Sequence, residues 1–164
     1  MTDDATIANA LTEAFERVHR ERMAGLPILH PGLSVAVIGP RDWHGDWVGM
    51  LLTPWCMNLV LLPGAASAFV PGSVGDKQVV AFPAGGFEFI ASEEEGIGAF
   101  AACSMFSPMQ AFVDQAAAVA TAEAIMVALF EPEPSAEKGA VGAASDGAGI
   151  SRRDLLRGRV SRRC

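Results

Sequence analysis

Apolar residues recur at helical spacing in the first part of the chain. One stripe within residues 3–24 has its members three or four positions apart: Ile7, Leu11, Phe15 and Val18. This spacing predicts an amphipathic helix that ends at Gly25, with the acidic start of the segment placed at the positive end of the helix dipole.

A second helix is predicted over residues 107–130. The run Ser107-Pro108-Met109-Gln110 offers a serine suited to cap a helix, a proline at the first helical position and a glutamine that completes a capping box. The sequence Glu-Pro-Glu-Pro after Phe130 ends the pattern, because proline cannot continue a helix.

About six shorter segments between the helices are rich in β-forming residues and separated by turn residues: 34–38, 46–52, 56–62, 77–82, 87–92 and 97–103. Their spacing favours antiparallel hairpins. We therefore predict an α+β fold of two layers, with an antiparallel sheet of about six strands flanked by an N-terminal and a C-terminal helix. The domain spans residues 1–130, the Pro/Gly/Ala-rich residues 131–150 are expected to be a flexible linker, and residues 151–164 a basic C-terminal tail.

Two of the predicted strands are apolar on both faces. In residues 46–52, Trp47 and Leu51 point to one side and most other apolar residues to the opposite side, and residues 56–62 repeat this pattern. Since both helices of a two-layer fold normally pack on one face, the second face is expected to lack a cover. The tail, a second copy of the chain or an apolar segment of a client could supply one. The candidate partner-binding residues here are Trp47, Trp55, Met57 and Leu59.

The charge of the chain is divided unevenly. Within a net charge of −7, residues 1–150 hold six basic and eighteen acidic residues, whereas residues 151–164 hold six arginines and one aspartate. An acidic domain argues against nucleic-acid binding, which needs clustered basic residues on the folded surface. The tail is expected to touch an acidic partner or to fold back on the acidic domain, with Leu155 and Leu156 anchored in an apolar groove.

The tail also carries a motif. Ser151-Arg152-Arg153-Asp154-Leu155-Leu156-Arg157 follows the order of a twin-arginine export signal, but no apolar region comes after it, so it cannot be an export signal itself. A sharper hypothesis than simple docking is that the tail occupies a groove that also accepts a similar segment of a partner. The tail residues proposed to bind partners are Arg152, Arg153, Leu155 and Leu156.

Candidate reactive groups are few and scattered. The three cysteines form no Cys-x-x-Cys pair, and the three histidines have no spacing that requires a metal site. Cys56 is expected to be a small packed residue, although His44, one strand earlier, could face it across a hairpin as a catalytic base. We predict no cofactor and no bound metal; a Cys56/His44 redox or hydrolytic enzyme and a nickel or iron carrier stay as alternatives.

The apolar stretches do not favour a membrane protein. Residues 48–62 are short and contain Pro54 and Asn58, and residues 111–130 carry Asp114, Gln115 and Glu123. The acidic, amphipathic start of the chain is the reverse of a signal peptide. We expect a cytoplasmic protein without membrane insertion.

Five stretches are distributed in order along the chain on both sides of residues 131–150: LPILHPGLSV, WHGDWVGMLLTPWCMNLVLLPG, FPAGGFEFI, ACSMFSPMQAF and SRRDLLRGR. The most specific pieces are Gly-x-Trp-x-Gly, Thr-Pro-Trp and Leu-Pro-Gly, formed by Gly45, Trp47, Gly49, Thr53, Pro54, Trp55, Leu62, Pro63 and Gly64. Together these pieces resemble the HybE-type, or HupJ-type, [NiFe]-hydrogenase assembly chaperones.

The resemblance implies a small cytoplasmic accessory protein and not an enzyme. Proteins of this family bind hydrogenase subunit precursors during maturation and hold back export until cofactor insertion and assembly are complete. The implied partner is the large or the small subunit precursor, or both, and a homodimer stays open. The family has no catalytic residues to carry over, and its pattern tolerates Met or Phe at the position of Cys56, which implies a packing role there.

Overall fold

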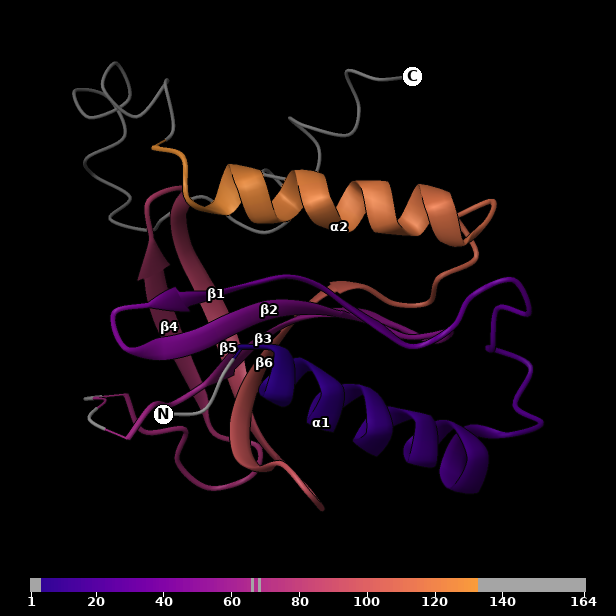
Figure 1. Ribbon diagram of the computed structural model, residues 1–164, viewed down its shortest axis with the longest axis horizontal. Coiled ribbons are helices and arrows are strands. Elements are labelled where there is room, and N and C mark those ends of the chain that lie inside the picture. Colours follow the sequence, from indigo (N-terminus) through magenta and orange to yellow (C-terminus); the bar gives the residue numbers. More distant parts are fainter. Residues whose placement is uncertain (1–3, 66, 68, 133–164) are drawn as a thin grey trace.

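The elements run from helix to sheet to helix along the chain. The computed structural model describes residues 4–65, 67 and 69–132 (Figure 1). In chain order the elements are α1 (Asp4–Val18), a π-helical turn η1 (His19–Met23), β1 (Ala36–Trp43), β2 (Asp46–Leu52), β3 (Met57–Leu62), β4 (Lys77–Phe82), β5 (Gly85–Glu94), β6 (Gly98–Phe106) and α2 (Gln115–Leu129). None of the helices in these ranges is long and apolar enough to cross a membrane.

The strands form one antiparallel sheet in the order β1-β2-β3-β6-β5-β4. Two hairpin-connected units, β1 to β3 and β4 to β6, are joined where β3 pairs with β6. The predicted α+β class, the antiparallel sheet of six strands and the two flanking helices are confirmed.

β1 runs past the turn that the sequence suggests. The sequence predicts a strand that stops at residue 38, but β1 continues to Trp43 through an irregularity between Ile38 and Arg41. Pro40 is tolerated there because β1 is an edge strand, and Gly39 takes a positive φ of 63° that suits glycine. The longer strand carries Trp43 and the turn after it to one end of the sheet.

The two helices lie on opposite faces of the sheet, α2 above and α1 below in Figure 1. The larger of two hydrophobic cores lies on the α2 side of the sheet, and we call it the α2-side core. The buried α2 residues that belong to it are Ala118, Ala122, Ile125, Met126, Ala128 and Leu129. The smaller core on the α1 side consists of Leu11, Val35, Trp47, Leu51, Val60 and Phe100. The expectation that both helices share one face and leave the other uncovered is therefore wrong. The central strands are apolar on both faces because each face has its own helix.

α2 starts at Gln115 and not beside Ser107, so the predicted capping box is wrong. The N-cap is Asp114, whose carboxylate accepts a hydrogen bond from the backbone N–H of Ala117 at 2.8 Å. An aspartate side chain that accepts an N–H in the first turn satisfies a donor that the helix itself leaves unpaired.

Residues 107–113 form a loop instead, and the Ser107–Pro108 peptide bond within it is cis. Gln110 donates from Nε2 to the carbonyl oxygen of Ile28 at 2.8 Å. The ring of His30 accepts from Gly32 N–H at Nδ1, which leaves Nε2 to donate to the carbonyl oxygen of Phe112 at 2.7 Å. These contacts join segments about eighty residues apart in the chain, which a local capping pattern cannot reveal.

Candidate functional site

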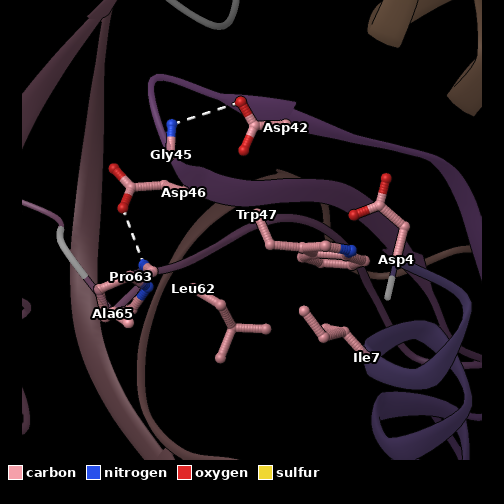
Figure 2. Close-up of a pocket in the computed structure, with 10 residues that line it drawn as sticks. Asp4, Ile7, Asp42, Gly45, Asp46, Trp47, Leu62, Pro63 and Ala65 are labelled. Atoms are coloured by element: carbon pink, nitrogen blue, oxygen red, sulfur yellow. Dashed lines mark hydrogen bonds between the residues drawn. The ribbon is translucent and has the colours of Figure 1, made fainter. Parts of the chain in front are cut away.

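A pocket of about 480 Å³ opens where the start of α1, the β1–β2 turn and the end of β3 meet. Figure 2 shows its side chains, and we call it the hairpin pocket. Its lining residues are Asp4, Ile7, Asp42, Gly45, Asp46, Trp47, Leu62, Pro63, Gly64 and Ala65. Trp47 lies opposite Leu62 in the β2–β3 register, so residues from two separate sequence pieces meet here.

Glycines shape this pocket by leaving out a side chain. Gly45 takes a positive φ of 87° in the β1–β2 turn. A Cβ on Gly64 would overlap the carbonyl oxygen of Gly45, so the two segments can approach closely only without one. A Cβ on Gly49 would overlap the indole ring of Trp47, because that ring lies across the backbone of Gly49. The Gly-x-Trp-x-Gly and Leu-Pro-Gly pieces therefore build the wall and the floor of one pocket.

Two aspartates fix the backbone around the opening. Asp42 Oδ1 accepts from Gly45 N–H at 3.3 Å, and Asp46 Oδ1 accepts from Gly64 N–H at 2.9 Å (Figure 2). The lining includes three carboxylates and no basic side chain. Arg41, the basic residue beside Asp42, has its guanidinium carbon 3.9 Å from the ring centroid of Phe130, which packs with the α2-side core. The pocket is therefore acidic above an apolar floor.

Trp47 forms much of that floor. The side chain is 4% exposed and packs with the α1-side core, and Figure 2 shows Leu62 and Ile7 beneath the ring. Its Nε1 has no hydrogen-bond partner among the described residues. A buried donor without an acceptor costs about 1–3 kcal/mol. An unpaired N–H of this kind needs an explanation, and its place in the wall of a pocket points to a ligand that accepts from it.

The predicted partner-binding residues take different places in the structure. Met57 and Leu59 have no exposed surface and lie in the α2-side core, so a partner could contact them only if α2 moved. Trp55 is half-buried, with its ring centroid 5.8 Å from that of His19 in η1. Trp47 lines the hairpin pocket. Their roles in partner binding stay predictions. Arg152, Arg153, Leu155 and Leu156 lie outside the described residues, as do the predicted linker beyond residue 132 and the basic tail.

Cys56 and His44 do not form the pair that the sequence allowed. His44 lies in the turn before β2 and Cys56 in the turn after it, and a seven-residue strand separates them by about 20 Å. The thiol is buried, and Thr53 Oγ1 lies 3.3 Å from Cys56 Sγ. Burial raises the pKa of the Cys56 thiol above its ordinary value, and the hydrogen bond with Thr53 lowers it by a smaller amount. The expectation that His44 could act as a base for Cys56 is wrong.

The first residue of the Thr-Pro-Trp piece, Thr53, has a structural role in the β2–β3 turn. The Thr53 hydroxyl oxygen accepts from the backbone N–H groups of Trp55 at 3.2 Å and Cys56 at 2.9 Å, which closes the β2–β3 turn. Within the described ranges, no group of three or more His, Cys, Asp and Glu side chains is arranged to hold a metal ion.

The sequence pattern did not bring Asp42 and Asp46 to a site: Asp42 lies between two predicted strands, and Asp46 is the first residue of the second one. A signal was present: the Gly-x-Trp-x-Gly piece begins β2 and the Leu-Pro-Gly piece ends β3. In an antiparallel pair with a short connection, the start of the first strand lies beside the end of the second. The contribution of Asp4 from α1 has no such signal, because it depends on the face that α1 covers.

The fold and the pocket together define a small α+β domain with a recess large enough for a ligand group. Comparisons with known proteins agree on its family. The family described as "[NiFe]-hydrogenase assembly, chaperone, HybE" matches residues 6–158. The hydrogenase expression/formation protein HupJ of Bradyrhizobium diazoefficiens is 39% identical, covering 98% of this chain and 93% of its own length. HupT of Azotobacter chroococcum is 44% identical over 74% of this chain and 82% of its own length.

A solved structure agrees as well. The solution structure of HybE from Escherichia coli superposes with a TM-score of 0.62 and 25% identity, and covers 76% of each chain. The protein belongs to the HybE family of [NiFe]-hydrogenase assembly chaperones.

Proposed function

We propose that this protein is an accessory chaperone of [NiFe]-hydrogenase maturation, which binds a hydrogenase subunit precursor and holds it from export until assembly is complete. It acts in the cytoplasm by binding, without catalysis of its own. The client is the large or the small subunit precursor, or both. Family membership supports the general role.

One observation supports binding at a particular place. Residues from two of the three most specific sequence pieces converge on the hairpin pocket, although they lie about fifteen residues apart in the chain. The lining combines carboxylates, an apolar floor and an unpaired indole N–H. These are groups that hold a polypeptide segment by hydrogen bonds and apolar contact.

The proposal can be tested in a host that makes the hydrogenase operon. A tagged copy of the chain should co-purify with a hydrogenase subunit that still carries its precursor form, identified by mass spectrometry. Deleting the gene should let incompletely assembled subunit leave the cytoplasm, as seen by fractionation. Normal retention of the precursor in the deletion strain, together with no subunit captured by the tagged chain, would contradict the proposed function.

A further inference from the structure

We propose that the hairpin pocket binds an arginine side chain from an extended segment of the client, and that Trp47 Nε1–H donates to an acceptor of the same segment. The identity of the client rests on the proposed function. The chemistry of the ligand rests on the pocket alone.

The charge of the pocket favours a cationic group. Asp4, Asp42 and Asp46 line it without any basic side chain. Asp42 and Asp46 each use one carboxylate oxygen for a backbone N–H, and a carboxylate has further lone pairs to accept from a ligand. The three carboxylates do not form a group able to hold a metal ion. A planar guanidinium has five donors spread over a fork, so it can reach separated carboxylates better than a point charge can.

The floor of the pocket suits the rest of an arginine side chain. Ile7, Trp47 and Leu62 all line the pocket and provide an apolar surface for the methylene stem. The volume of about 480 Å³ exceeds the need of one side chain, which leaves room for the adjoining backbone.

The unpaired indole N–H distinguishes a peptide from a simple cation. Trp47 is 4% exposed, and its Nε1 lacks an acceptor within the described residues. In Figure 2 the edge of the ring that carries this nitrogen faces Asp4, the first described residue of α1. Rotation of that one side chain toward a bound guanidinium would open the N–H to the ligand. A peptide supplies both the cation and a backbone carbonyl that accepts from Trp47.

The direct test follows the three indole N–H signals of the full-length chain by ¹⁵N–¹H NMR. The probe is a blocked peptide, Ser-Arg-Arg-Ala-Leu-Leu-Lys, and its match has glutamine in place of both arginines. Trp47→Phe assigns the Trp47 signal. We expect the arginine peptide to move this signal and to leave those of Trp43 and Trp55 in place. We expect the glutamine peptide to bind about tenfold more weakly or worse, because it lacks charge-assisted hydrogen bonds.

Substitution of the pocket carboxylates tests the same contacts. Asp46→Asn keeps an oxygen that accepts from Gly64 N–H but removes the charge, so the fold should persist while affinity falls about tenfold. Asp114→Asn is the matched control, since it removes the same charge at the start of α2 and keeps the cap. An unmoved Trp47 signal, equal affinity for both peptides, or unchanged affinity in Asp46→Asn would each overturn the inference.

Two further experiments ask whether the arginine comes from a client or from the chain's own tail, and whether the client is a hydrogenase subunit. The first experiment asks whether the chain's own tail fills the pocket, and its probe is the double variant Arg152→Gln/Arg153→Gln in the full chain. If the tail does fill the pocket, this variant would move the Trp47 signal without any peptide and would bind the peptide more tightly. That result would overturn the assignment of the ligand to a client. In cells, subunit capture retained by Asp42→Asn/Asp46→Asn would also overturn it, while the proposed function would stand. Peptide binding by a chain that captures no hydrogenase subunit would uphold the pocket chemistry and contradict the proposed function.

Discussion

At the scale of single residues, the specific sequence pieces follow from contacts. Gly49 is a glycine because the Trp47 ring crosses its backbone, and Gly64 is one because the carbonyl group of Gly45 occupies the space of a side chain. Thr53 is a threonine whose hydroxyl closes the β2–β3 turn. Cys56 lies in that turn as a buried small residue. The three specific pieces therefore shape a turn at one end of β2 and a pocket at the other.

Gly64→Ala should destabilise the protein by about 2–3 kcal/mol. The new methyl group would overlap a backbone atom, so the β1–β2 turn or the end of β3 must shift. Gly25→Ala is the comparison: it has open space and only the cost of a positive φ of 82°, about 1 kcal/mol. Urea unfolding measures both. Equal losses of unfolding free energy in the two variants would show that the close approach of Gly64 to Gly45 does not constrain residue 64.

The Cys56 thiol should lose part of its stabilising contribution at alkaline pH. Burial raises its pKa in the folded state, so the contribution is full below the unfolded pKa of about 8.5 and falls as pH rises toward the folded pKa. The difference in unfolding free energy between the wild type and Cys56→Ala should therefore be smaller at pH 10 than at pH 7. The measurement is chemical denaturation with reductant present. A difference that grows with pH would contradict the raised pKa.

At the scale of elements, register and capping decide where functional groups lie. The β2–β3 register sets Trp47 beside Leu62, and the continuation of β1 past Pro40 brings Asp42 to the same end of the sheet. Because α2 starts at Gln115, with Asp114 as its N-cap, residues 107–113 form a loop that contacts the segment around His30. Local pattern placed the strands well and this helix start poorly.

Asp114→Ala should cost about 1 kcal/mol, because the first turn of α2 would lose the acceptor for Ala117 N–H. Ser107→Ala, at the position that the sequence alone favoured as the cap, should change stability by less than about 0.5 kcal/mol, as an exposed loop substitution. Thermal unfolding of the two variants decides between the positions. A larger loss for Ser107→Ala would argue for a helix start near Pro108.

At the scale of the whole molecule, one sheet separates two cores. α2 closes the larger one and α1 the smaller. The last turn of α1 and the π-helical turn after it are tied to the β5–β6 connection: Arg17 of α1 donates to the carbonyl oxygen of Glu95 at 2.7 Å, and Arg22 of η1 pairs with Glu94 at 2.6 Å. Because α1 covers the second face of the central strands, the apolar residues on that face belong to a core. The hairpin pocket opens beyond the start of α1.

Leu11→Ala should destabilise the protein by about 2–4 kcal/mol. Leu11 has no exposed surface and fills the centre of the α1-side core, so its removal leaves a cavity. Glu13→Ala, on the exposed side of the same helix, is the control and should stay within about 0.5 kcal/mol. Denaturant unfolding of both variants measures the contribution of α1. A loss below 1 kcal/mol for Leu11→Ala would mean that α1 contributes little to covering this face.

The sequence by itself determined the approximate number of strands and their places along the chain, the amphipathic first helix and the family. The nearly continuous apolar runs in residues 46–52 and 56–62 also indicated that the central strands are apolar on both faces. Periodicity records which side chains avoid water but not which element covers them. The face taken by each helix and the meeting of Asp4, Asp42, Asp46 and Trp47 were decided by the tertiary structure alone. Each depends on contacts between residues distant in the chain, for which the local sequence holds no record.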